Sequence, residues 1–273
     1  MTVVTTKMIT AEHAISRFRR DLTLGAAVRF ALLGAALLCV LVGPFFGKRF
    51  DSTIALFVIG MVWLVLSFRS ARNSQQTAMF PSLIAAGQYD VAEQQIERTL
   101  NTFSMFKSVK VLSLHNLAML RHAQNRYQES AMLCRALLGQ RLGPLDHLTK
   151  TSRLILADDL LELNDSAGAY EAIAELYNYR LTLGEALRLL YVEQDYLWRI
   201  GAWDRMFAGI NTKVQLAEIL PTPQSARTQA LLSLAAKKLN RTDWSDWLRR
   251  RVELLTDVQS LIGQRPVLRE LWN

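Results

Sequence analysis

Two long apolar stretches follow one another near the start of the chain. Phe30 to Gly47 and Ser52 to Phe68 contain no Asp, Glu, Lys, Arg or His, and only Lys48-Arg49-Phe50-Asp51 separates them. At about 1.5 Å per residue, helices of 18 and 17 residues extend roughly 27 and 26 Å, close to the thickness of a bilayer's hydrocarbon core. Because backbone polar groups must be paired in lipid, this pattern predicts a transmembrane helical hairpin over residues 28–69.

Two other interpretations of these stretches are less consistent with the pattern. A cleaved signal peptide would have a shorter apolar core nearer the N-terminus, and no second apolar stretch would follow at once. A hairpin buried in a soluble core would keep a polar face, whereas Phe57, Trp63 and Leu66 place apolar side chains on all faces of the second stretch.

After Arg72 the pattern changes to amphipathic helices separated by short polar breaks. One break recurs with its leading residues 38, 39, 37 and 39 positions apart. Its copies are Gly87-Gln88-Tyr89-Asp90, Asn125-Arg126-Tyr127-Gln128, Asn164-Asp165-Ser166-Ala167, Gly201-Ala202-Trp203-Asp204 and Asn240-Arg241-Thr242-Asp243. Gly and Asn tolerate the left-handed conformation that ends a helix. We expect the aromatic residue to pack beneath the turn and an Asp or Gln to cap the next helix. The sequence thus predicts a helix–turn–helix unit about every 38 residues.

These units resemble the tetratricopeptide repeat family over roughly residues 73–260. The first unit matches the family's pattern at Gly87, Tyr89, Ala92, Ile96 and Thr99. The later units match at Ala118, Asn125, Tyr127, Ser130 and Cys134, at Ala157, Asn164, Ala169, Ile173 and Leu176, and at Gly201, Trp203, Met206 and Ile210. The spacing exceeds the family's usual repeat of about 34 residues, so the loops between units are longer.

The resemblance implies an all-α protein in which the hairpin is followed, over residues 70–273, by a TPR-like right-handed α-solenoid of four to five helix pairs. Residues 1–27 form an N-terminal segment before the hairpin. Pro81 is expected to shorten the first helix of unit one and to provide a hinge between membrane and solenoid. The closing stretch Trp244 to Ile262 has helical spacing, and Arg249-Arg250-Arg251 supplies the polar face of a terminal cap.

Charge indicates how the hairpin is oriented. The net charge is +8, and residues 1–69 hold eight Lys and Arg against only Glu12, Asp21 and Asp51. Basic residues flank the outer ends of both apolar stretches more than the turn, which favours both termini and the helical domain in the cytoplasm, with anionic lipid beside the hairpin. The rest of the chain is nearly neutral, so its charge does not suggest nucleic acid. Cys39 and Cys134 do not suggest a disulfide framework.

The sequence contains no recognisable catalytic, cofactor or phosphate-binding motif. His115 and His122 share a helix face two turns apart but lack a third metal ligand at suitable spacing. Asp158-Asp159 and Glu162 are typical of a solvated helix face. We therefore expect neither a metal nor a cofactor, and no enzymatic activity.

In the tetratricopeptide family, the first helix of each unit lines a concave groove that binds partner proteins. The resemblance places the following residues in that groove: His115, Met119, His122, Asp158, Glu162, Arg188, Tyr191, Asp195, Arg199, Arg227, Lys237 and Lys238. Its C-terminal half is basic with one aromatic residue, which suits an acidic or carboxyl-terminated peptide segment.

Three functions follow from these observations. The first is a membrane-anchored adaptor that binds a partner protein in the groove. The second is a structural or assembly subunit of a larger membrane complex, held through its hairpin. The third, which has least support, is a membrane enzyme that uses Asp158, Glu162 and the histidines.

Overall fold

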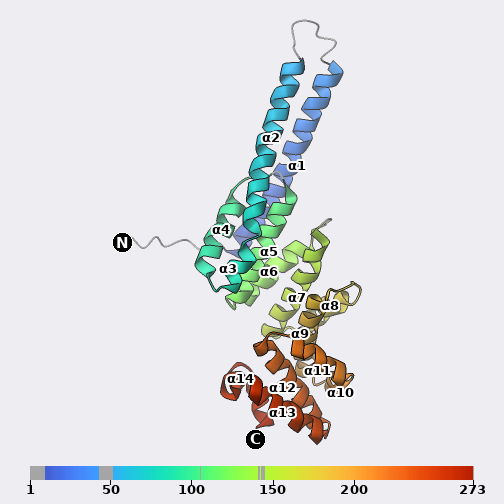
Figure 1. Ribbon diagram of the computed structural model, residues 1–273. Helices are drawn as coiled ribbons and strands as arrows, with labels where there is room; N and C mark the ends of the chain where they lie inside the picture. The colour runs from blue at the N-terminus through green and yellow to red at the C-terminus, as the bar shows by residue number, and fades with distance from the viewer. Residues whose placement is uncertain (1–9, 43–51, 105, 141, 143–144, 273) are drawn as a thin grey trace, which may run out of the picture. The chain divides into compact units, whose positions relative to one another are not determined.

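The computed structural model describes residues 10–42, 52–104, 106–140, 142 and 145–272. Every regular element in these ranges is a helix, which confirms the all-α class (Figure 1). The chain divides into two compact units, residues 1–155 and 156–273, and each is described here by itself. The turn predicted at residues 48–51 lies outside the described residues.

Unit 1 begins with the two apolar helices, α1 (Ala11–Val42) and α2 (Ser52–Thr77). Both are long and apolar enough to cross a membrane, and only 6% of the most apolar window of each is buried. Their exposed side chains include Phe30, Leu33, Leu37, Leu38, Phe57, Val58, Leu64 and Phe68. Transfer of each such side chain out of water is favourable by about 1.5–3 kcal/mol, so this surface is suited to lipid or to other apolar helices.

Both helices continue well beyond the predicted membrane spans. α1 begins at Ala11, and α2 runs past Phe68 to Thr77. In these extensions the buried positions change to a helical stripe, with Ala11, Ala14 and Phe18 at most 2% exposed. The extension of α1 packs on α4, α5 and α6, and that of α2 packs on α4 and α5, so the hairpin is built into unit 1 (Figure 1).

Two buried polar contacts hold these extensions in place. The Lys110 ammonium, 1% exposed, lies 2.6 Å from the Asp21 carboxylate of α1. It also donates to the carbonyls of Thr99 and Leu100 at the end of α4, at 3.3 and 2.7 Å. The Asn116 side-chain amide donates to the carbonyl of Thr77, the last residue of α2, at 3.0 Å.

The helix break expected at Pro81 is present. α3 (Phe80–Ala85) begins after Met79 with Pro81 in its first turn. The break is not a free joint, because Thr77 before it and Phe80 after it are both fully buried. The break therefore lies within the packed core of unit 1, and its action as a hinge stays a prediction.

Five pairs of helices are joined by the turns that the sequence predicts. The pairs are α3 with α4 (Tyr89–Asn101), α5 (Lys107–Ala123) with α6 (Tyr127–Leu138), α7 (Asp146–Glu162) with α8 (Ser166–Leu176), α9 (Leu183–Arg199) with α10 (Trp203–Phe207), and α12 (Thr222–Lys238) with α13 (Thr242–Leu255). The boundary between the two units falls within α7.

The leading residue of each turn is left-handed. Gly87, Asn125, Asn164, Gly201 and Asn240 have φ between 56° and 72°. The amide after each donates to a carbonyl five residues earlier, as Gln88 does to Leu83 at 3.0 Å, and the same bond recurs at the other four turns. This is the Schellman termination, so the local interpretation of the repeated element is confirmed.

The predicted caps are mostly wrong. Of the N-cap residues of the five helices that follow these turns, only Asp165 caps with its side chain, which accepts from the Gly168 amide at 2.9 Å. Asp90, Asp204 and Asp243 instead lie within the first turn of their helices, where a carboxylate interacts favourably with the helix dipole.

Unit 2 departs from the expected regular pairs at two places. α10 ends after five residues at Phe207, and α11 (Ile210–Ile219) follows the left-handed Gly209. The helix expected from Trp244 to Ile262 ends at Leu255, and α14 (Val258–Gln264) begins after Asp257, whose carboxylate caps it at 2.9–3.3 Å. The 3-10 helix η3 (Pro266–Leu271) follows.

The core of unit 2 is centred on α12, of which nearly every residue from Ser225 to Ala236 is buried. Leu231 and Leu234 pack with Leu197 of α9, Val252 of α13 and Leu268 of η3. Of the predicted polar face, Arg250 is exposed, whereas Arg251 pairs with Glu218 and stacks over Trp247 at 4.8 Å. The C-terminal helices are therefore part of one packed core with α9 and α12.

Candidate functional site

In unit 1, the residues expected to line the groove do not form an open surface. His115 is 4% exposed, and its Nδ1 lies 3.0 Å from the Ser152 hydroxyl. Met119 and His122 are half-buried, and the His122 ring packs edge-on against Tyr127 at 5.9 Å. His115 is therefore a packed interior residue, and its ring contacts Ser152 of α7.

In unit 2, five of the predicted residues, Glu162 among them, gather with Arg265 into one ionic cluster. Tyr191, Asp195 and Arg199 come from three successive turns of α9, and Arg227 comes from α12. Arg227 lies 2.5 Å from Asp195 and donates to the Tyr191 hydroxyl. Arg199 lies 3.2 Å from Asp195 and 3.7 Å from Glu162.

Arg265, which follows α14, completes the ionic cluster from the C-terminal end of the chain. Its guanidinium donates to both Glu162 carboxylate oxygens and lies 3.5 Å from Asp195. The sequence analysis missed Arg265, because 103 residues separate it from Glu162 and no local pattern connects them. Arg199 also donates to the Asn164 side chain at 3.0 Å, which links the cluster to the turn between α7 and α8.

Burial and charge act in opposite directions in this cluster. Asp195 is fully buried, which favours its neutral form, but the guanidiniums of Arg227, Arg265 and Arg199 outweigh burial and hold its pKa below the usual value. Burial, with Asp158 and Asp195 nearby, raises the pKa of Tyr191 to about 12. Asp195 is therefore ionised and Tyr191 is neutral at physiological pH.

The ionic cluster does not present the basic surface expected for an acidic partner. Its arginines are already paired with carboxylates of the same unit, and Asp158 is buried as well. Lys237 and Lys238 are exposed, but they lie at the end of α12 and interact with Glu270 of η3. Arg188 is half-buried on α9. These contacts favour a structural role for the cluster.

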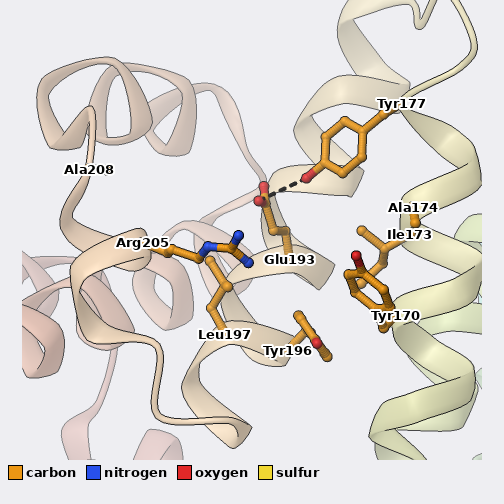
Figure 2. Close-up of a pocket in the computed structure, with 9 residues that line it drawn as sticks. All are labelled: Tyr170, Ile173, Ala174, Tyr177, Glu193, Tyr196, Leu197, Arg205 and Ala208. Atoms are coloured by element: carbon orange, nitrogen blue, oxygen red, sulfur yellow. Dashed lines mark hydrogen bonds between the residues drawn. The ribbon is translucent and has the colours of Figure 1, made fainter.

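A second feature of unit 2 is an open cavity of about 380 Å³ that the sequence analysis did not predict (Figure 2). It is lined by Tyr170, Ile173, Ala174 and Tyr177 of α8 and its C-cap, by Glu193, Tyr196 and Leu197 of α9, and by Arg205 and Ala208 of α10 and the residue after it. We call this the tyrosine cavity.

The early end of α10 accounts for the tyrosine cavity. After Phe207 the chain turns through Ala208 and the left-handed Gly209, so α10, which packs on α9 and α12, is only five residues long. Ala208, whose side chain is a single methyl group, lines the cavity where a longer helix would have continued. The Gly that follows so soon after the Gly-x-Trp turn is the sequence signal from which this break could have been predicted.

Two polar side chains of the tyrosine cavity form a hydrogen-bonded pair. The Tyr177 hydroxyl donates to the Glu193 carboxylate at 2.9 Å, and the Arg205 guanidinium lies on the same side of the cavity (Figure 2). Burial, together with the Glu193 charge and its hydrogen bond, raises the pKa of Tyr177, so its phenol stays a donor. The Tyr170 and Tyr196 rings stack with centroids 5.9 Å apart and an interplanar angle of 28°.

Two tyrosines of the cavity are exposed to solvent, which distinguishes them from core residues. Tyr170 and Tyr177 are 52% and 60% exposed, whereas Ile173 and Leu197 at the base are 3% exposed. Large aromatic side chains at a surface depression are typical of residues that contribute most of the binding energy in protein interfaces.

Within the described residues, no group of three or more His, Cys, Asp and Glu side chains is placed to hold a metal ion. Cys134 is buried in α6 and Cys39 is half-buried in α1, and neither is part of a disulfide. The tyrosine cavity offers one carboxylate, which does not define a metal site.

Comparison of the chain with protein-family models, with curated proteins and with solved structures finds no match. The tetratricopeptide resemblance therefore stays a prediction based on the repeated turn and its spacing.

Proposed function

We propose that the protein is a membrane-anchored, TPR-like adaptor that binds a partner protein through its C-terminal unit. The observation that carries this proposal is the construction of unit 1, in which one helical hairpin is apolar and exposed at one end and packed into a helical domain at the other. Such a hairpin is suited to hold the domain against a membrane, where confinement raises the effective concentration of its partner.

The charges at the polar end of the hairpin support a cytoplasmic domain. Arg17, Arg19 and Arg20 lie on the extension of α1, and Arg69 and Arg72 lie at the same end of α2. Because basic residues are retained on the cytoplasmic side, these charges support a cytoplasmic position for this end and for the helical domain. Anionic lipid head groups would interact with the same residues.

The five Schellman turns support a repeat architecture. Because identical turns recur every 37–39 residues, we propose that the helix pairs stack as a right-handed solenoid of the tetratricopeptide type. The partner site differs from the one expected by resemblance, since the arginines of unit 2 are paired internally. The tyrosine cavity offers exposed aromatic rings, and we assign partner binding to it.

Site-specific photo-crosslinking in native membranes tests this function. A photoreactive amino acid replaces Tyr177 in the cavity, Leu254 on α13, or Leu64 on α2. Leu254 is the matched control because it is 88% exposed in the same unit but outside the cavity. We expect a discrete protein adduct from position 177 and none from position 254. Equal adducts from both positions would contradict a specific site at the cavity.

The alternative is a structural subunit held through the hairpin. It is favoured by Gly34 and Gly60, where an added Cβ would meet nothing within 4 Å, so each helix has a smooth face that another helix can approach. In this case position 64 gives the discrete protein adduct and position 177 gives none.

A further inference from the structure

We propose that the tyrosine cavity binds an extended, proline-rich segment of the partner protein. This inference rests on the proposed function, because it names the chemistry of the segment that the same cavity receives. The occupant is inferred from the size of the cavity, its charge, and the spacing of its aromatic rings.

The size of the cavity favours an extended chain. Its volume of about 380 Å³ lies at the small end of the range for ligand pockets, roughly 300–1,000 Å³. A helix has a diameter of about 10–12 Å with its side chains and is too wide to enter such a space. Strand addition needs an open sheet edge, whereas α8 and α9 use their backbone groups within their own helices. A polyproline II segment needs neither a space as wide as a helix nor a sheet edge, since it has no internal hydrogen bonds and presents its carbonyls outward.

The charge of the cavity disfavours a cationic occupant, and a proline-rich segment brings no cation. Its lining contains one carboxylate, Glu193, and one guanidinium, Arg205, so their charges balance. Lys213 donates to the Arg205 and Met206 carbonyls at the end of α10, at 2.7 and 3.1 Å, and adds positive charge nearby. A cationic side chain would therefore gain little here, although aromatic rings and a carboxylate alone would suit one.

The spacing of two tyrosines along α8 matches the repeat of a polyproline II helix. Tyr170 and Tyr177 are seven residues apart on α8 and its C-cap, which separates them by about 10 Å along the axis. One turn of polyproline II, three residues, advances about 9 Å. Two prolines three positions apart would each contact one ring. Within the described residues, the hydroxyls of Tyr170 and Tyr196 have no hydrogen-bond partner, so they are available to donate to the carbonyls of such a segment.

A peptide titration on the purified full-length protein in mild detergent tests this inference. The probe is a fluorescein-labelled deca-proline peptide, followed by fluorescence anisotropy. A labelled Gly-Ser peptide of the same length is the flexible control. We expect saturable binding of deca-proline and none of the Gly-Ser peptide. We also expect Tyr170→Ala or Tyr177→Ala to weaken binding by about tenfold or more, as is common for aromatic residues at binding hot spots.

Two variants keep the test independent of folding defects. Tyr177→Phe keeps the ring that contacts proline and removes only the hydroxyl bound to Glu193, so binding should stay within about twofold of wild type. Leu254→Ala removes an exposed apolar side chain elsewhere in unit 2 and should have no effect. Equal losses in Tyr177→Phe and Tyr177→Ala would overturn the role of ring stacking.

Failure of this inference is distinguishable from failure of the proposed function. If deca-proline does not bind, or binds no better than the Gly-Ser peptide, the proline chemistry is wrong, while a crosslink from position 177 still supports the adaptor. If deca-proline binds as expected and position 177 gives no adduct in membranes, the cavity chemistry holds and the adaptor function is contradicted.

Discussion

The ion pair between Lys110 and Asp21 should control how firmly the membrane hairpin is attached to unit 1. Asp21→Asn removes the counter-ion of an ammonium that is 1% exposed. Breaking a buried pair in this way costs about 3–5 kcal/mol, and the two carbonyls that still accept from Lys110 favour the lower end. At roughly 2–4 °C per kcal/mol, a loss of about 3 kcal/mol lowers Tm by about 6–12 °C.

The same residue predicts how this loss depends on pH. Burial lowers the pKa of Lys110 from 10.5, although Asp21 opposes the shift, so Asp21→Asn lowers it further. The variant can also fold with Lys110 in its neutral form, which needs no counter-ion. The destabilisation therefore cannot exceed the free energy of deprotonating that lysine in the unfolded chain at the same pH. With an unfolded pKa near 10.5, this limit is about 4.8 kcal/mol at pH 7 and about 1.4 kcal/mol at pH 9.5. A folded pKa below the unfolded one means that stability rises with pH in this window. The defect of Asp21→Asn should therefore shrink as pH rises.

Thermal unfolding of the full-length protein in mild detergent, followed by circular dichroism near pH 7 and near pH 9.5, measures both effects. Arg19→Gln is the matched control, because Arg19 is exposed on the same extension of α1. The double change of Asp21→Leu with Lys110→Met removes both charges and should return Tm to within about 3 °C of wild type. If the double variant is as unstable as Asp21→Asn, or if the Asp21→Asn defect does not shrink at high pH, an uncompensated Lys110 is not the cause.

Two further predictions concern the cluster and the repeated turns. Arg265→Ala removes the hydrogen bonds to Glu162 and one of the three guanidiniums around Asp195, so it should destabilise unit 2 by about 1.5–3 kcal/mol in urea unfolding. Arg250→Ala, at an exposed position, should have no effect. The arginines hold the pKa of Asp195 below 3.8, so its ionised form stabilises the fold above that pH, and this contribution should disappear as pH falls through the folded pKa. Arg265→Ala should therefore move acid unfolding to higher pH. An unchanged acid midpoint would contradict this reasoning. Asn240→Gly should be close to neutral and Asn240→Ala should cost about 1 kcal/mol, since φ is 56° there; equal effects would argue against a left-handed residue.

The repeated turns could be predicted from the sequence because they depend on local chemistry. A residue such as Asn125 or Gly201 ends a helix through its own φ and through hydrogen bonds within six residues. The apolar helices could be predicted for the same reason, since lipid-facing length and composition are local properties. The extensions of α1 and α2 beyond their apolar stretches were not predicted. Whether a helix continues past its apolar part depends on what packs against it, as α5 does here.

The candidate site depends on contacts that sequence spacing does not reveal. The groove prediction brought Glu162, Tyr191, Asp195, Arg199 and Arg227 to one place, because all five lie on first helices of neighbouring repeats. It could not show that Arg265 would reach them and balance their charge. The tyrosine cavity was missed because it results from the absence of helix after Phe207 rather than from a motif, and only the three-dimensional arrangement shows what remains uncovered.

The central claim is that lipid surrounds the exposed hairpin while the helical units lie in water. Nitroxide spin labels on single cysteines at Leu37, Leu64 and Leu254, with the protein reconstituted in liposomes, test this claim directly. Each of these side chains is exposed, so labelling does not disturb the core. We expect the labels at 37 and 64 to collide with dissolved oxygen but not with a polar nickel chelate, and the label at 254 to collide with the chelate. Equal access of the chelate to all three positions would contradict the account.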